Sequence, residues 1–366
     1  MYKILISGYY GFNNIGDESI LSAVTDNLKE KLEDIEITVL SQNPDATAER
    51  YQVKSCSRKS FFSILKAMIK TDLLISGGGS LLQDVTSKKS ILYYLAIIWM
   101  AVFLRKPFFI YSQGIGPISS NFNRKITART LKKAAAIVVR DDNSKEFLLD
   151  MGFSEESIVV TADPVLRIRK VDLDRGKQIL KQEGIKLDEN KMTVGFAIKE
   201  RNLGSEFVSE LCKSMEWLIK ERNAQIVLIP FHFSEDMAVI EAIENKLGDN
   251  VFSLKHKYLT KEMLSVIGNM DILVGVRLHA LIHAAIMNVP MIAIAYDPKI
   301  NSFMNSIDMK AMSSIHDFRA NFFQEEYDKT LKNKDVIEEQ IKHKLKELVA
   351  KLDENEKLIM ELRKGV

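Results

Sequence analysis

Polar and charged side chains gather in this sequence where short apolar runs end, and one such end holds an arginine and a histidine. Arg277, Leu278 and His279 follow an apolar run and open a segment of small apolar residues at helical spacing. An arginine and a histidine at a helix N-terminus offer several N–H donors beside the positive end of the helix dipole. Burial of both without an anionic partner would be unfavourable, which predicts a bound anion. The alternative is an ion pair within the protein, to Asp271 or Asp297.

The histidine of this motif has the chemistry to move a proton. Imidazole titrates near neutral pH, so His279 is the candidate general acid or base beside the predicted anion. His283 lies four residues further on, a spacing that paired zinc ligands also show. However, no glutamate follows His279 directly and no third ligand is nearby in the sequence. We therefore expect no metal at this motif and interpret His283 as a packed core residue.

Two glycine-rich loops follow predicted strands in the first half of the chain. The loop 8–18 (GYYGFNNIGDE) opens a helix, and the loop 76–84 (SGGGSLLQD) is interpreted as a second turn from strand to helix. Bare N–H groups at a helix N-terminus suit a phosphate or carboxylate, whereas helix capping and a tight turn are the structural alternatives. Neither loop has the dinucleotide fingerprint or the P-loop spacing. The candidate ligand contacts in these loops are Asn14, Asp17, Gly78, Gly79 and Asp84.

Further polar residues end neighbouring predicted strands. Gln113 and Arg140 end or follow strands of the first half, and His232 follows the second strand of the latter half. The carboxyl ends of parallel strands share one edge of a sheet, so these side chains are expected beside the loops. For each of them a turn or an internal hydrogen bond is the structural alternative. Lesser candidates at strand ends are Asp141, Ser144, Asp163, Asp236, Tyr296 and Lys299.

The elements that must position these residues alternate between strand and helix. Short apolar runs are separated by longer segments with helical spacing, which is the signature of parallel sheets with right-handed crossovers. The predicted strands are 3–7, 35–40, 73–76, 108–112, 137–140 and 158–161, followed by 192–198, 225–230, 272–276 and 291–295. The sequence therefore predicts an α/β protein with two Rossmann-like domains facing a cleft, where open α/β sheets bind ligands.

The length of the chain accommodates two domains. Its 366 residues are 46% hydrophobic, enough to bury two cores. The predicted divisions are a first domain at 1–165, a charged boundary at 166–190, a second domain at 191–315 and a helical tail at 316–366. The tail carries one apolar stripe, which must pack on something. Docking back across the domain junction is the simplest use, and a contact in a homo-oligomer is the alternative.

Charge and cysteine content exclude several classes of protein. The chain has 51 basic and 49 acidic residues, a balance without the electrostatic footprint of a nucleic-acid-binding protein. Its cysteines, Cys56 and Cys212, are far apart, which argues against a disulfide framework and against a metal site. The first residues resemble a strand rather than a signal peptide, so we expect a cytoplasmic protein.

One segment qualifies that expectation. Residues 91–104 (ILYYLAIIWMAVFL) contain no charge or amide side chain, but a membrane span needs ~20 apolar residues. We interpret the segment as a helix buried against a sheet. The alternative is an interfacial helix with basic flanks, extended by residues 58–70, which would attach the protein peripherally to the inner face of the membrane.

Taken together, these motifs resemble the polysaccharide pyruvyltransferase family, especially its branch for secondary cell-wall polysaccharides of Gram-positive bacteria. The resemblance runs in order from residue 8 to residue 299 through GYYGFNNIGDESIL, SGGGSLLQDVTSKKSILYY, YSQGIGPI, VVRDDNS, ADPV, GVRLHALIHAA and IAYDPK. It implies a GT-B-like fold and phosphoenolpyruvate as co-substrate, with no other cofactor. It also implies a sugar acceptor, N-acetylmannosamine in a lipid-linked cell-wall precursor, and a pyruvate ketal as product.

The same resemblance assigns roles to individual residues. The family's Arg-Leu-His element falls on Arg277, Leu278 and His279, with the arginine binding the donor and the histidine acting as acid or base. Family members often carry an arginine after the first strand of the second domain, where this chain offers Lys199 or Arg201. Lysine is a point charge without the bidentate geometry of arginine. Apart from the resemblance, its position at a strand end makes His232 a candidate on the donor side. Asn14, Asp17, Gly78, Gly79, Asp84, Gln113 and Arg140 are candidates for binding the acceptor or lining the cleft.

Two other functions remain open. A GT-B glycosyltransferase would share the fold and bind a nucleotide sugar in the second domain, because fold does not settle function. A non-catalytic sugar- or lipid-binding module would require an exposed segment 91–104 and an internally paired Arg277–His279 corner.

Overall fold

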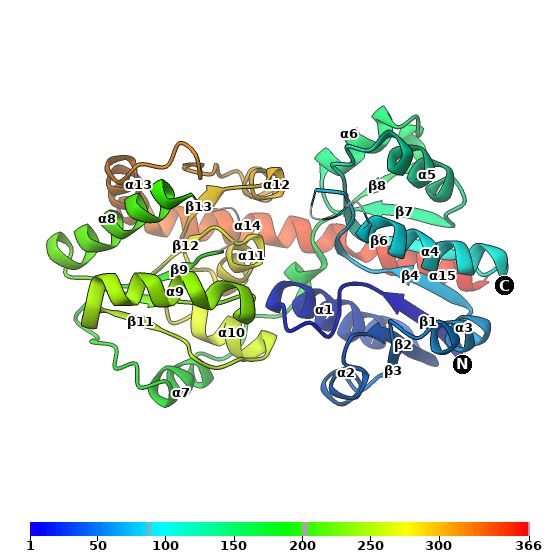
Figure 1. The fold of residues 1–366 in the computed structure, drawn as a ribbon, viewed down its shortest axis with the longest axis horizontal. Coiled ribbons are helices and arrows are strands. Elements are labelled where there is room, and N and C mark those ends of the chain that lie inside the picture. Colours follow the sequence, from blue (N-terminus) through cyan, green and yellow to red (C-terminus); the bar gives the residue numbers. More distant parts are fainter. Residues whose placement is uncertain (86, 88, 200–203, 365–366) are drawn as a thin grey trace. The chain divides into compact units, whose positions relative to one another are not determined.

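The chain folds into two compact α/β units. The computed structural model describes residues 1–85, 87, 89–199 and 204–364. The first unit comprises Met1–Arg167 together with Leu348–Val366, and the second comprises Ile168–Glu347 (Figure 1). No helix within the described residues is both long and apolar enough to span a membrane.

The first unit is built on a parallel sheet in the order β3-β2-β1-β4-β6-β7-β8, with β5 paired to β6. Its strands are β1 (Tyr2–Ser7), β2 (Ile35–Ser41), β3 (Lys54–Ser57), β4 (Leu73–Ser76), β5 (Gly79–Leu82), β6 (Phe108–Ile115), β7 (Ala136–Val139) and β8 (Val159–Val160). The central β6 is buried along its whole length, as expected for a parallel strand covered on both faces.

Helices cover both faces of this sheet. They are α1 (Ile15–Lys31), α2 (Pro44–Tyr51), α3 (Phe61–Lys70), α4 (Ser90–Phe103), α5 (Asn121–Leu131), α6 (Asp142–Asp150) and the C-terminal α15 (Asp353–Lys364). One core joins α3, α4 and α5 to the face that carries Leu5, Leu74 and Phe108. Successive strand residues point to opposite faces. Tyr111 follows Phe108 by three positions in β6 and accordingly lies on the other face, where its hydroxyl donates to Glu356 of α15.

The second unit repeats the plan with the strand order β11-β10-β9-β12-β13-β14. Its strands are β9 (Thr193–Ala197), β10 (Gln225–Leu228), β11 (Val251–Ser253), β12 (Ile272–Gly275), β13 (Met291–Ala295) and β14 (Ser313–Ser314). Its helices are α7 (Asp174–Gln182), α8 (Ser205–Glu221), α9 (Phe233–Leu247), α10 (Thr260–Ile267), α11 (Leu278–Met287), α12 (Pro298–Ser306) and α13 (Ala320–Lys332), and α14 (Lys334–Lys351) follows them. The apolar residues of these strands and of α8, α9 and α13 form its core.

The helical tail predicted at 316–366 is not a separate part. Phe323 and Tyr327 of α13 are fully buried in the core of the second unit. The chain then continues through α14 into α15, which packs on the first sheet, where Asn355 donates to the Ser112 hydroxyl at 2.8 Å. The predicted boundary at 166–190 is likewise folded, because Ile179 of α7 is buried within the second unit.

The local structure differs from the prediction at the glycine-rich loop after β4. Residues 76–84 do not open a helix, because Gly79 begins the short strand β5, which pairs with β6. Gly79 has a φ of +89°, a conformation that favours glycine, and α4 begins only at Ser90. The expectation of a helix N-terminus at this loop, and of an anion bound there by helix amides, is therefore wrong.

Candidate functional site

Four neighbouring strand ends of the second unit bring the predicted donor residues to one edge of its sheet. Lys199 follows β9, His232 follows β10, Arg277 follows β12 and Tyr296 follows β13. Their strands are adjacent and parallel. Side chains distant in sequence thus share the carboxyl edge, which is where open α/β sheets bind ligands.

Arg277 is held in place by an internal ion pair. Its Nη2 binds Asp236 Oδ1, and Asp236 is fully buried. The second oxygen of Asp236 accepts hydrogen bonds from the backbone amides of Phe231 and His232 at 3.0 and 2.8 Å. This carboxylate therefore ties the end of β10 to the end of β12. The more distant Glu235 Oε2 lies 4.0 Å from Nη2.

The two partners predicted for Arg277 have other roles. Asp271 accepts from the Thr193 amide at 2.8 Å. Asp297 caps α12 by accepting from the Lys299 amide at 3.0 Å. The internal-pair interpretation was therefore right about the kind of interaction and wrong about the partner. Asp236 was noted only as a lesser candidate, since its sequence position showed no link to Arg277.

Donors remain at this corner after the pairing with Asp236. Arg277 Nε is buried and has no hydrogen-bond partner among the described residues. Arg277 is also the N-cap of α11, and no side chain there accepts from the helix amides. The first N–H groups of an α-helix have no acceptor within the helix. A guanidinium edge and a helix N-terminus are thus available together, an arrangement that favours an anion.

The two histidines of α11 have different environments. His279 lies in the first turn of α11 and is only partly buried. His283 is fully buried, and its ring packs edge to face on Phe231 with centroids 5.3 Å apart. Burial lowers the pKa of His283 to about 3, and the charge of His279 adds to the decrease. The interpretation of His283 as a core residue is confirmed.

Metal coordination finds no support in the arrangement of potential ligands. Within the part of the chain that the structure describes, no group of three His, Cys, Asp or Glu side chains is placed to hold a metal ion.

Two lysines at this edge, Lys199 and Lys299, lie near the ring of Tyr296. Lys199 Nζ lies 4.2 Å from the centroid of the Tyr296 ring, and Lys299 Nζ lies 5.6 Å from it. Lys299 also pairs with Asp297 at 3.3 Å. Lys199 lies just beyond the end of β9, and its correspondence to the family arginine stays a prediction. The other candidate for that position, Arg201, lies outside the described residues.

His232 and Leu278 complete the predicted donor set. His232 is buried, and its Nδ1 lies 3.4 Å from the Ser234 hydroxyl. Leu278 is the first residue of α11, and its side chain is buried. Leu278 thus contributes packing and a backbone N–H rather than a polar side chain.

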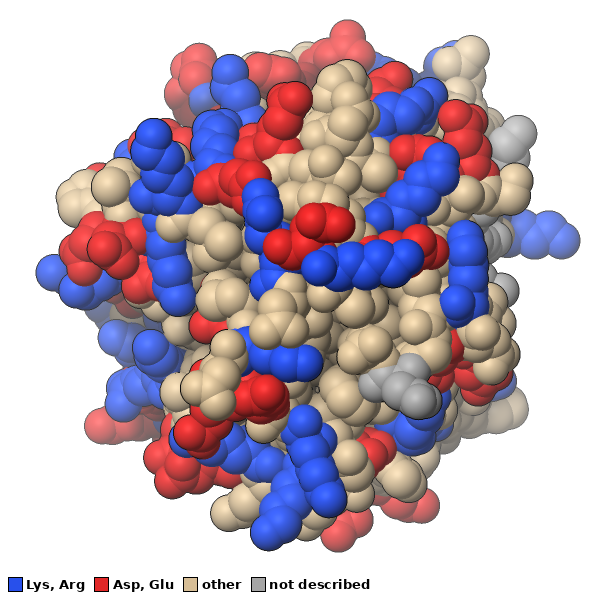
Figure 2. Space-filling model, turned by 90° about the vertical axis from the view of Figure 1, so that its left-hand side faces the viewer, with Lys and Arg blue, Asp and Glu red and all other residues tan. Residues whose placement is uncertain are grey.

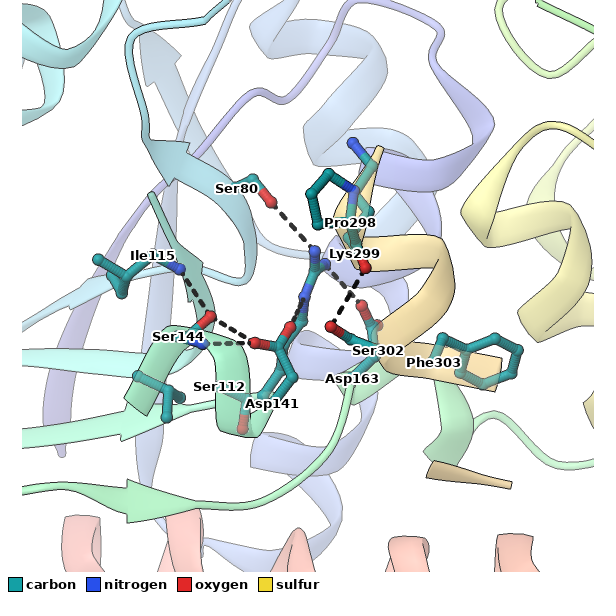
Figure 3. Close-up of polar contacts among 12 residues, drawn as sticks. Ser80, Ser112, Ile115, Asp141, Ser144, Asp163, Pro298, Lys299, Ser302 and Phe303 are labelled. Atoms are coloured by element: carbon teal, nitrogen blue, oxygen red, sulfur yellow. Dashed lines mark hydrogen bonds and ion pairs between the residues drawn. The ribbon is translucent and has the colours of Figure 1, made fainter. Parts of the chain in front are cut away.

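The corresponding edge of the first unit contains an arginine that is bound by three side chains. Arg140 is buried and uses three nitrogens, with Nε 3.3 Å from Asp141, Nη1 3.0 Å from Asp163 and Nη2 3.0 Å from the Ser80 hydroxyl. Figure 3 shows Ser80, Asp141 and Asp163 pointing toward this guanidinium. Burial alone would lower the pKa of Arg140, but the two carboxylates outweigh it and raise the pKa. Asp141 also caps α6, accepting from the Ser144 amide at 2.8 Å.

The start of α1 holds the other polar group of this edge. Asn14 caps the helix, and its side-chain amide donates to Asp17 at 2.5 Å. Glu18 is buried and accepts from the Gly11 amide at 2.8 Å and from the Tyr51 hydroxyl. Glu18 thus closes the loop 8–18, whereas Asn14 and Asp17 are partly exposed at its rim.

The glycine pair and Gln113 are packed into the sheet edge. A Cβ on Gly78 would lie 3.0 Å from Ile20 and 3.3 Å from Pro164, so this position is closely enclosed. Gln113 is fully buried in β6 and donates to the Gly77 carbonyl at 3.0 Å. Its Oε1 has no hydrogen-bond partner among the described residues. Gln113 therefore belongs to a strand and not to the turn that was its structural alternative.

Asp84 has a structural environment. Its carboxylate is buried and accepts from the amides of Ser119 and Ser120 at 2.7 and 2.9 Å and from the Asn123 side chain at 3.3 Å. Burial by itself would raise the pKa of Asp84, but these hydrogen bonds lower it below its ordinary value. The oxygens are already occupied, which leaves Asp84 poorly suited to orient a substrate.

Comparison with known families identifies the protein family of this chain. The family description "Polysaccharide pyruvyl transferase" matches residues 14–298. The chain belongs to this family. As a polysaccharide pyruvyl transferase it is a transferase of polysaccharide biosynthesis, and the matched region includes α1 and the Arg277–His279 corner.

A curated relative supports this assignment. The amylovoran biosynthesis protein AmsJ of Erwinia amylovora is 22% identical over 373 residues, an alignment that covers 85% of this chain and 88% of AmsJ.

Solved structures with low sequence identity show the fold. The UDP-GlcNAc 2-epimerase from Neisseria meningitidis superimposes with a TM-score of 0.64 at 14% identity, covering 100% of both chains. HepE from Anabaena, in complex with UDP and glucose, gives 0.68 at 10% identity, also covering 100% of both chains. The predicted GT-B-like pair of Rossmann-like α/β domains is confirmed.

Proposed function

We propose that this polysaccharide pyruvyl transferase moves the pyruvyl group of phosphoenolpyruvate onto two hydroxyls of one sugar, forming a ketal and releasing phosphate. Phosphoenolpyruvate is the sole co-substrate in this proposal, and no other cofactor takes part. Family membership supports pyruvyl transfer in polysaccharide biosynthesis. The donor, the ketal and the acceptor are the proposed additions.

The observation that carries the proposal is the corner at Arg277. Phosphoenolpyruvate bears a carboxylate and a phosphate, which require cations and N–H donors. The buried Nε of Arg277 has no partner among the described residues, and it adjoins the uncapped N-terminus of α11. Lys199 provides a further ammonium group at the neighbouring strand end, held against Tyr296. These groups would bind the anionic donor, and Asp236 would orient the guanidinium.

His279 is the proposed proton donor. In the first step, a sugar hydroxyl oxygen attacks C2 of phosphoenolpyruvate while His279 protonates C3, so the methylene becomes a methyl group. In the second step, another hydroxyl of the same sugar displaces phosphate from C2, breaking the C–O bond to the leaving group. The hydroxyl protons lost in these steps balance the proton on the methyl group and the proton on phosphate.

The acceptor is proposed to use the first unit. Asn14 and Asp17 present partly exposed polar groups at the start of α1, suited to orienting sugar hydroxyls. Gly78, Gly79 and Gln113 shape the adjoining strand edge. The acceptor that the family resemblance suggests is an N-acetylmannosamine unit of a lipid-linked cell-wall precursor, and such a reaction would take place in the cytoplasm.

The test is phosphate release from phosphoenolpyruvate, with and without a β-N-acetylmannosaminyl acceptor, followed by mass spectrometry of the product. We expect acceptor-dependent release and a pyruvylated sugar, and we expect His279→Ala to lower kcat by about 100-fold to 10,000-fold, the usual contribution of a general acid. His343→Ala is the matched control, since that histidine is exposed on α14. Turnover of a nucleotide sugar, with no phosphoenolpyruvate turnover across a broad acceptor panel, would replace this proposal by the glycosyltransferase.

A further inference from the structure

The balanced charge of the whole chain conceals a strongly basic stretch in the first unit. Between Tyr51 and Arg140 the sequence contains fifteen Lys or Arg residues and only two acidic residues, Asp72 and Asp84. Asp84 is buried and hydrogen-bonded, and Asp72 accepts from the Lys3 amide. Among the described residues, neither carboxylate forms an ion pair with a Lys or Arg side chain. This stretch includes α3, α4 and α5.

The outer surface of α3 and α4 adds apolar side chains to this charge. Both helices pack on the same face of the first sheet and contact each other, so their solvent-facing sides adjoin (Figure 1). Phe62 and Phe103 expose 81% and 78% of their surfaces, and Phe61 and Ile69 are exposed as well. We name this surface the α3–α4 face; it consists of Phe61, Phe62, Lys66, Ile69, Lys70, Leu92, Ala96, Trp99, Phe103, Arg105 and Lys106.

Helical spacing shows that α4 has two apolar sides rather than one. Its buried side, which includes Ile91, Leu95 and Ile98, packs on the sheet. The residues Leu92, Ala96, Trp99 and Phe103 recur at intervals of three or four, so they form a second stripe on the solvent side. The core interpretation of this segment is thus correct for one side only. A core helix has no need for a second apolar stripe.

The basic side chains of the α3–α4 face have no close acidic partner, although the carboxylate of Glu36 interacts with Lys70 at longer range. Among the described residues, no carboxylate forms an ion pair with Lys66, Lys70, Arg105 or Lys106. The second unit differs, because several of its lysines pair with adjacent acids, as Lys220 does with Glu216 and Lys342 with Glu339. On the face of the second unit in Figure 2, basic and acidic side chains are interspersed.

We propose that the α3–α4 face binds the surface of an anionic lipid bilayer. The exposed Phe and Leu side chains and the partly exposed Trp99 would enter the boundary between head groups and acyl chains, and the lysines and arginines would contact the anionic head groups. Charge complementarity favours this occupant over a second copy of the chain, since two copies of this face would bring like charges together. The apolar centre favours lipid over nucleic acid, whose backbone requires cations but not aliphatic contacts.

This inference goes beyond the proposed function and does not depend on its chemistry. The test is co-sedimentation of the full chain with vesicles of phosphatidylcholine alone, or with about a third phosphatidylglycerol. We expect binding to the anionic vesicles at least about tenfold tighter than to neutral ones, weakening as salt is raised. The double variants Phe62→Ser/Phe103→Ser and Lys66→Glu/Lys70→Glu should each reduce that binding by about tenfold or more.

Matched controls lie on the second unit. Phe322→Ser removes an exposed phenylalanine of α13, and Lys220→Glu/Lys342→Glu reverses two exposed lysines. These controls should bind anionic vesicles like the unaltered chain. All variants should keep the thermal midpoint of the unaltered chain and its rate of phosphate release with a water-soluble acceptor. Equal binding to both vesicle types, no binding to either, or loss of binding in the controls alone would overturn the proposal. The proposal would also be overturned if the chain formed a dimer that Phe62→Ser/Phe103→Ser dissociates. Binding of duplex DNA without binding of vesicles would overturn it as well.

Discussion

Two arginines occupy similar positions in the two units but have different surroundings. Arg140 separates β7 from α6, and Arg277 separates β12 from α11. Arg140 has protein partners for three nitrogens, and Asp141 caps the helix that follows. Arg277 has a close ion pair through Nη2 only, its Nε has no partner in the described part of the chain, and its helix has no side-chain cap. An arginine at a strand end is thus suited to bind a ligand only where its own unit leaves donors unsatisfied.

The largest expected effect concerns stability at Arg140. Arg140→Gln would leave two carboxylates, Asp141 and Asp163, without their cation in a buried site. Removal of one partner from a buried ion pair costs about 3–5 kcal/mol, so the thermal midpoint should fall by several degrees or more. The measurement is thermal unfolding followed by circular dichroism.

A double variant separates a structural role from a binding role at Arg140. Arg140→Gln/Asp163→Asn removes one of the stranded charges and should recover part of the lost stability. Turnover of phosphoenolpyruvate by the folded double variant should stay within about threefold of the unaltered enzyme, which corresponds to ~0.6 kcal/mol. A stable Arg140→Gln variant with strongly reduced turnover would break the comparison, since Arg140 would then act on substrate.

The next effect concerns turnover at Arg277. Arg277→Gln should lower kcat/KM for phosphoenolpyruvate by about 100-fold, or roughly 3 kcal/mol, because hydrogen bonds between charged groups are lost. Arg277→Lys should recover only part of this, as lysine lacks the planar fork. Steady-state phosphate release gives both values.

The buried Asp236 requires its own control, because Arg277→Gln leaves it without its cation. Arg277→Gln/Asp236→Asn should restore stability without restoring turnover. If the double variant regained both, the contribution of Arg277 would be structural, like that of Arg140.

The sequence was sufficient to predict most of this architecture. β4 and β13 occupy the predicted residues, and other predicted strands differ by a few residues at their ends. Apolar runs flanked by helical spacing are local signals, which explains this agreement. The short strands β3, β5, β11 and β14 were missed, and of these KSCS in β3 and the two serines of β14 have little apolar content.

The site was less predictable because its decisive contacts are not local. Nothing in the sequence linked Arg277 to Asp236, which lies 41 positions away, or showed that Arg140 has side-chain partners for all three nitrogens and Arg277 does not. The glycine-rich loop was misread for a related reason, since the pairing of β5 with β6 depends on a strand about thirty residues further on. In contrast, His283 was correctly interpreted because the residues around it in α11, apart from His279, are apolar.

The smallest expected effect is on how stability depends on pH, and it concerns the buried His283 of α11. The pKa of His283 is lowered from 6.5 to about 3, so its neutral form is favoured in the folded chain. In the unfolded chain the same imidazole takes up its proton near the ordinary pKa of 6.5, at a higher pH than in the folded chain. This shift therefore leaves the free energy of unfolding unchanged above about pH 7. As pH falls below that value, the free energy of unfolding decreases by at most ~1.4 kcal/mol per pH unit.

His283→Leu removes this proton uptake. Relative to the unaltered chain, its thermal midpoint should change less between pH 7 and pH 5, values that bracket the ordinary histidine pKa of about 6.5. An unchanged pH dependence would mean that His283 is not held neutral, and the distinction between the two histidines would fail.

The central claim is that the anionic donor binds at Arg277 and not at Arg140. Calorimetric titration of phosphoenolpyruvate into the unaltered chain, Arg277→Gln/Asp236→Asn and Arg140→Gln/Asp163→Asn tests it most directly. We predict that the Arg277 double variant weakens binding by at least about tenfold, or ~1.4 kcal/mol, while the Arg140 double variant binds like the unaltered chain. Weakened binding in the Arg140 double variant with unchanged binding in the Arg277 double variant would contradict the account.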